Sequence, residues 1–111
     1  MPTFEQGDVV KVPFPYTDRN TRQRRPALVV SKGNSGVDGG LIWVVMITSA
    51  DNRPWADDVS LGPRYADAGL PAPSVIRPAK IATIDAISAE PIGRLDHDRL
   101  MNVLDAIRRR L

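Results

Sequence analysis

Residues 24–31 read Arg-Arg-Pro-Ala-Leu-Val-Val-Ser, two cations followed by a proline and an apolar run. Short uninterrupted runs of aliphatic side chains are typical of strands that are covered on both faces. A second such run, Leu-Ile-Trp-Val-Val-Met-Ile-Thr, occupies residues 41–48, and four glycines lie between the runs within residues 33–40. Because glycine clusters mark tight connections, we expect strands over 27–32 and 41–48 to form a hairpin on which the fold is built.

The chain up to residue 93 predicts further short strands. All ten prolines and all eight glycines lie between residues 2 and 93, which disfavours long helices there. The expected elements are strands over 8–13, 57–61, 74–77 and 81–84, with Pro78 separating the last two, a polar loop over 14–24 and turns over 62–73.

The last segment predicts an amphipathic helix. Asp96 is a suitable N-cap, and the last turn ends in three arginines at 108–110, where cations meet the negative end of the helix dipole. The apolar residues that follow at helical spacing are Leu100, Val103, Leu104, Ile107 and Leu111. We therefore expect one domain over residues 1–111, a mainly β, strongly bent antiparallel barrel closed by a C-terminal helix, with Trp43 in its core.

Composition indicates the class of protein but does not identify a ligand. Of 111 residues, 42% are hydrophobic and 25% charged, as in a soluble globular domain. Net charge is +2, but twelve of the fifteen cations are arginine, which fits either a polyanionic ligand or a GC-rich genome. The absence of cysteine excludes disulfides and thiol chemistry. No signal-peptide pattern is visible, and the longest apolar run, 41–47, is well below the roughly 20 residues of a membrane span. We expect a cytoplasmic protein.

An arginine cluster precedes the first apolar run. Arg19, Arg22, Arg24 and Arg25 place four guanidinium groups within seven residues. Pro26 fixes its own backbone and restricts the preceding residue, so Arg25 is expected to be held rigidly at the start of a strand. Guanidinium groups match phosphate oxygens in geometry and charge, which predicts a phosphate-binding site here.

Three further residues are candidates for the same site. Thr48 and Ser49 end the second apolar run, where their hydroxyls could either bind a phosphate beside Arg25 or satisfy nearby backbone groups. Arg77 repeats the arginine–proline order of Arg25, and it could either converge on the same groove or pair with a nearby aspartate.

A few aromatic side chains lie where they could stack on unpaired bases. Phe14 and Tyr16 open the arginine-rich loop, and Trp55 could stack on an unpaired base or cover the edge of the barrel.

Other chemistry is less favoured by the sequence. A single histidine, His97, excludes a histidine acid–base pair and fits a solvated helix start. Asp51, Asp57 and Asp58 do not have the spacing of a tight metal site.

With these residues in place, the chain resembles the MazF/PemK family of toxins from bacterial type II toxin–antitoxin systems. No single motif is strong, but together the motifs follow the family order over residues 7–107. The matching stretches are GDVV at 7–10 with Pro-Phe at 13–14, RPALVVS at 25–31, MITS at 46–49, SVIR at 74–77, TID at 83–85 and GRL at 93–95.

The resemblance implies an SH3-like barrel (MazF/PemK/CcdB-like) that forms a homodimer and cleaves single-stranded mRNA without metal or other cofactor. It implies catalytic roles for Arg25 and Thr48, with support from Ser49 and Arg77. Some members place a carboxylate two residues after the second arginine, but Ala79 stands there in this chain. The residues expected to bind RNA are Phe14, Tyr16, Arg22, Arg24, Arg53 and Trp55.

A second chain is also implied, an acidic MazE-like antitoxin that covers the RNA-binding surface. Two alternatives stay open at this stage. The chain could be a non-catalytic SH3-like module that binds nucleic acid or protein. It could also be a gyrase-directed toxin of the same fold, although its Arg-Arg-Arg-Leu ending differs from the Trp-Gly-Ile ending of that toxin.

Overall fold

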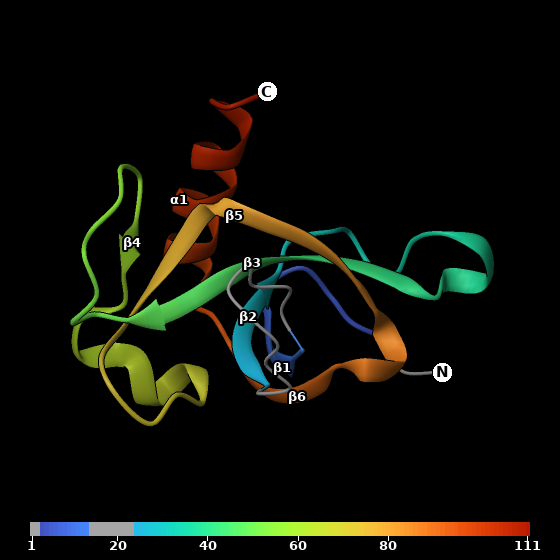
Figure 1. Ribbon diagram of the computed structural model, residues 1–111, viewed down its shortest axis with the longest axis horizontal. Coiled ribbons are helices and arrows are strands. Elements are labelled where there is room, and N and C mark those ends of the chain that lie inside the picture. Colours follow the sequence, from blue (N-terminus) through green and yellow to red (C-terminus); the bar gives the residue numbers. More distant parts are fainter. Residues whose placement is uncertain (1–2, 14–23) are drawn as a thin grey trace.

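The computed structural model describes residues 3–13 and 24–111, and this part of the chain forms six strands, three short 3-10 helices and one α-helix (Figure 1). The strands are β1 (Asp8–Val12), β2 (Arg25–Val29), β3 (Leu41–Ser49), β4 (Val59–Ser60), β5 (Ser74–Asp85) and β6 (Glu90–Arg94). The helices are η1 (Val37–Gly39), η2 (Gly62–Ala68), η3 (Ala86–Ser88) and α1 (His97–Arg108).

The six strands form one antiparallel sheet in the order β4-β5-β3-β2-β1-β6. The sheet curls into a half-barrel in which β3 and β5 are the longest strands. α1 lies against one side of this half-barrel (Figure 1). β2 and β3 pair in antiparallel fashion, with Ala27 opposite Met46, as the predicted hairpin requires. The mainly β architecture with one C-terminal helix is therefore confirmed.

Apolar side chains cover both faces of the central strands. Leu28 and Val45 belong to a cluster that includes α1, whereas Ala27 and Val44 belong to a second cluster. Because neighbouring residues of a strand point to opposite faces, these clusters lie on opposite sides of the sheet. This explains why the two apolar runs show no alternation.

α1 forms as its sequence predicts, except that it ends at Arg108 and leaves Leu111, the last residue of the predicted apolar face, exposed. The Asp96 carboxylate accepts a hydrogen bond from the Arg99 backbone N–H at 3.1 Å, which is the N-cap interaction. Leu100, Val103 and Leu104 are buried against the sheet, and Ile107 packs against the same cluster. No helix in residues 3–13 and 24–111 has the length and apolar character needed to cross a membrane.

One predicted break does not exist. Residues 74–85 form the single strand β5 rather than two strands, because the pairing with β3 shifts between Val45 and Met46. Val45 lies opposite Ile81 and Met46 opposite Arg77, so Pro78 falls inside the shift. A proline there breaks no regular pair of the ladder, which is why the strand continues through it.

Three other expectations need correction. Trp43 is 50% exposed rather than part of the core. It lies near the end of α1, where the helix does not cover it, and it lines a surface hollow with Ile81 and Ile107. The strand expected over 57–61 is limited to β4. The strand β6 is absent from the predicted elements, because its proline, Pro91, disfavours a strand in the local sequence. β6 lies at the edge of the sheet, where the missing N–H of a proline is tolerated.

Two glycines bring η2 and β6 into backbone contact. A Cβ on Gly69 would lie 2.0 Å from the Ile92 carbonyl oxygen, and a Cβ on Gly93 would lie 2.1 Å from that of Ala68. Neither distance can accommodate a side chain. Gly69 directly precedes segment 70–74, so this contact holds the start of that segment. The segment then lines a cavity with residues at the start of β2 and the end of β3.

Candidate functional site

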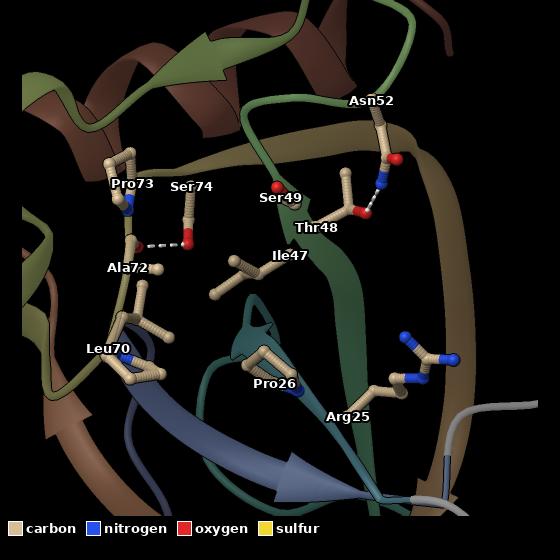
Figure 2. A pocket seen from close by; sticks show the side chains of 11 residues that line it. Arg25, Pro26, Ile47, Thr48, Ser49, Asn52, Leu70, Ala72, Pro73 and Ser74 are labelled. Atoms are coloured by element: carbon tan, nitrogen blue, oxygen red, sulfur yellow. Dashed lines mark hydrogen bonds between the residues drawn. The ribbon is translucent and has the colours of Figure 1, made fainter.

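Arg25 and Thr48 lie at the adjacent ends of two paired strands. Ala27 pairs with Met46, and continuing this antiparallel register by two residues places Arg25 opposite Thr48. Residues that oppose one another in this way share a face of the sheet. Both line a cavity of about 220 Å³ (Figure 2), and Arg25 is exposed. The two residues expected to be catalytic are therefore brought together.

The cavity has a polar and an apolar side. Figure 2 shows Arg25 and Thr48 on one side of the strand ends and Pro26 and Ile47 on the other, as strand alternation requires. Ser74 donates a hydrogen bond to the Ala72 carbonyl oxygen at 2.8 Å and helps to shape the apolar wall. The remaining lining residues are Ser49, Asn52, Leu70, Pro71 and Pro73.

The two hydroxyls at the end of β3 have different partners. Ser49 Oγ accepts a hydrogen bond from the Asp51 backbone N–H at 3.1 Å, so this hydroxyl satisfies the backbone at the strand-to-loop transition. Thr48 Oγ1 accepts one from Asn52 Nδ2 at 2.5 Å (Figure 2). Asn52 was not among the predicted site residues. The sequence signal that could have indicated it is the Asp-Asn pair directly after a strand, which is typical of a turn that folds back.

Arg77 lies on the same face of the sheet as Thr48 but does not line the cavity. It is 5% exposed, and its Nε and Nη2 each lie 3.1 Å from an oxygen of Asp58. Nη2 also donates to the Arg53 carbonyl oxygen at 2.8 Å, and the guanidinium carbon stands 4.4 Å from the centre of the Trp55 ring. Of the two interpretations of Arg77, the geometry favours the aspartate pair, although the pair is buried rather than at the surface.

The other candidate RNA-binding residues are distributed around this site. Arg24 is exposed, and its Nη2 donates to the carbonyl oxygens of Lys11 and Ser88 at 3.1 and 2.6 Å. Arg53 is exposed in the loop between β3 and β4, and Trp55 is 42% exposed with Arg77 over its ring. Three candidates lie outside the described residues: Phe14, Tyr16 and Arg22.

The aspartates and the histidine have structural surroundings. Asp58 pairs with Arg77, whereas Asp57 lies within 3.4 Å of both Arg109 and Arg110. His97 is exposed at the first position of α1, as expected. Over residues 3–13 and 24–111, no three His, Asp or Glu side chains are grouped so that they could hold a metal ion.

The sequence profile of the PemK-like, MazF-like toxins of type II toxin–antitoxin systems matches residues 5–111. Since this is nearly the whole chain, the protein belongs to that family. No curated protein matches the sequence.

Solved structures of this family have the same fold. The MazE–MazF complex of Deinococcus radiodurans is 24% identical with a TM-score of 0.71, covering 96% of this chain and 93% of the other. The Mycobacterium tuberculosis toxin MazF-mt6 is 22% identical with a TM-score of 0.67, covering 92% and 93%. An endoribonuclease bound to its cognate antitoxin, from a mycobacterial species, is 17% identical with a TM-score of 0.68, covering 95% and 91%.

Proposed function

We propose that this protein is a metal-independent endoribonuclease toxin that cleaves single-stranded RNA and is neutralised by a cognate antitoxin. The observation that carries the proposal is the placement of Arg25 and Thr48 at the adjacent ends of the paired strands β2 and β3, where both line one cavity. Family membership supports it, as do similar structures that are an endoribonuclease and toxin–antitoxin complexes.

The chemistry needs alignment and charge stabilisation more than an external nucleophile. The ribose 2′-oxygen attacks the adjacent phosphorus and loses its proton, and the bond from phosphorus to the 5′-oxygen breaks as that oxygen gains a proton. The products are a 2′,3′-cyclic phosphate and a 5′-hydroxyl. Arg25 would stabilise the negative charge on the pentacoordinate phosphate, and Thr48 would donate a hydrogen bond to one of its oxygens. Because an arginine stays protonated, its main contribution is electrostatic.

The surface around the cavity suits a phosphodiester chain. Arg53 and Trp55 are exposed in the loop that follows the lining residue Asn52, so they could hold a phosphate and stack on a base. An acidic antitoxin segment would be attracted by the same cations and would exclude RNA. Inhibition by the antitoxin should then be competitive with RNA and should weaken as salt increases.

The proposal includes a homodimer. Trp43 and Ile81 are 50% and 52% exposed on neighbouring strands and line the same hollow as Ile107. Exposed apolar groups that gather in this way are typical of protein-binding surfaces. Sedimentation equilibrium should give a dimer, and Ile81→Asp should shift it toward monomer. A parent protein that stays monomeric would contradict this part of the proposal.

The activity is tested with purified protein, single-stranded RNA and EDTA. We expect cleavage products with a 2′,3′-cyclic phosphate and a 5′-hydroxyl. Intact RNA that shifts in a gel would instead favour the non-catalytic binding module. Inhibition of DNA supercoiling without RNA cleavage would favour the gyrase-directed toxin.

A further inference from the structure

We propose that Asn52 is a positioning residue that sets the direction in which the Thr48 hydroxyl donates its hydrogen bond. The inference deepens the proposed function and rests on it, because Thr48 must act on the RNA phosphate for its orientation to matter. It assigns a role to a residue that the sequence analysis did not identify.

The hydrogen bond between Asn52 and Thr48 has a defined donor and acceptor. Asn52 Nδ2 carries hydrogens and can only donate, so Thr48 Oγ1 is the acceptor in their 2.5 Å hydrogen bond. A hydroxyl has one hydrogen and two lone pairs, and one lone pair is used here. The hydroxyl hydrogen must therefore point elsewhere. Because Arg25 and Thr48 line the same cavity, a phosphate that Arg25 binds there could accept this hydrogen.

Asn52 is exposed, so its side chain needs a fixed backbone to hold this geometry. The turn that leads to it supplies one end of the support. The Asn52 backbone N–H donates to the Ser49 carbonyl oxygen at 3.1 Å, and the Asp51 N–H donates to Ser49 Oγ at 3.1 Å. The Ala50 N–H donates to the Pro73 carbonyl oxygen at 3.0 Å, which ties the turn to the cavity wall.

The buried ion pair supplies the other end of the support. The carbonyl oxygen of Arg53, the residue next to Asn52, accepts a 2.8 Å hydrogen bond from Arg77. Arg77 is held in turn by Asp58 and packs over the Trp55 ring. The loop that carries Asn52 is thus fixed on both sides. Arg77 acts on the site through this loop and not by contact with the phosphate.

The first experiment removes the Asn52 amide. In Asn52→Ala we expect kcat to fall roughly 3- to 10-fold with KM nearly unchanged, as befits the loss of one hydrogen bond that orients a catalytic group. Asn52→Asp keeps the size but presents an acceptor, which would capture the Thr48 hydrogen, so kcat should fall further than in Asn52→Ala. Asn102→Ala, on the exposed side of α1, is the matched control and should behave like the parent.

The second experiment tests whether Asn52 acts through Thr48. Thr48→Val removes the hydroxyl at nearly constant volume and should lower kcat. In that background Asn52→Ala should cause no further loss, because the group that it orients is gone. Additive losses in the double variant would overturn the proposal, since they would mean that Asn52 acts independently of Thr48.

The outcomes separate this inference from the proposed function. If the parent does not cleave RNA, both fail. If the parent cleaves RNA and Thr48→Val is impaired but Asn52→Ala cleaves at the parental rate, the assignment of Asn52 alone is wrong. Equal melting temperatures of the parent and Asn52→Ala would support an effect on the site rather than on folding.

Discussion

Arg25 and Arg77 share a local sequence, an arginine before a proline in a strand, but they occupy opposite environments. Arg25 is exposed at the start of β2 and lines the cavity with Thr48. Arg77 is buried within β5, and its guanidinium is held by Asp58 and by the Arg53 carbonyl oxygen.

The difference is made by what packs over each residue. The loop between β3 and β4 folds over Arg77 and brings Asp58 with it, so the cation is used to hold that loop. Arg25 faces a cavity in which a charged ligand can meet it. Substitution of Arg77 should therefore reduce stability, whereas substitution of Arg25 should reduce activity.

The largest expected effect on stability is that of Arg77→Ala. This change leaves the Asp58 carboxylate buried without its cation and should lower the free energy of unfolding by roughly 3–5 kcal/mol. Urea denaturation measures it, with Arg25→Ala as the matched variant, which should change stability by no more than about 0.5 kcal/mol. Equal decreases in the free energy of unfolding of the two variants would contradict the different roles assigned to these arginines.

A smaller effect is expected of Gly93→Ala. The added Cβ would lie 2.1 Å from the Ala68 carbonyl oxygen, so β6 and η2 must move apart, at a cost of roughly 1–3 kcal/mol. Since η2 leads into segment 70–74, RNA cleavage should also fall, without any change at Arg25. Gly40→Ala is the control, because its Cβ would meet the Val37 carbonyl oxygen at an ordinary 3.7 Å. A Gly93→Ala protein of parental stability would contradict this account of the contact.

The smallest effect is expected of Asp96→Ala, which lies far from both arginines in the chain. Burial raises the pKa of Asp96, but hydrogen bonds and charge from Arg99 outweigh it, so the pKa lies below its ordinary value of 3.8. Removing the cap should cost about 1 kcal/mol near neutral pH. RNA cleavage should be unchanged.

The sign of the Asp96 pKa shift fixes the pH dependence of this loss. A carboxyl with a lowered pKa in the folded state stabilises the protein above pH 3.8, and this contribution disappears as pH falls through the lowered pKa. The parent and Asp96→Ala should therefore converge in stability in strong acid. A constant difference between pH 7 and pH 2 would show that the ionised cap is not the cause.

Sequence periodicity predicted those parts of the fold that depend on local pattern. Leu100, Val103 and Leu104 are spaced for one helix face, and they pack as expected. Trp43 was misplaced because strand alternation specifies the face on which a side chain lies, but not how far a helix covers that face. Pro78 predicts a break from local sequence alone, whereas the shift in pairing that accommodates it depends on the neighbouring strand β3.

The sequence likewise predicted part of the candidate site, namely the residues at the strand ends. The order of residues placed Arg25 before one strand and Thr48 at the end of the next, and antiparallel pairing brings such ends together. The Asp-Asn pair at 51–52 indicates a turn, and an aspartate partner for Arg77 was one of two interpretations. That Asn52 binds Thr48 and Asp58 binds Arg77, however, depends on the tertiary course of the loop. A cation can be recognised from sequence, but whether it meets a ligand or a buried carboxylate depends on how the loop folds.

RNA cleavage by Arg25→Ala, measured in EDTA beside the parent, tests the central claim most directly. Because Arg25 is placed to stabilise charge on the phosphate and not to support the core, the rate should fall by about 10²–10³ while the melting temperature stays unchanged. Cleavage by Arg25→Ala at a rate close to that of the parent would contradict the account.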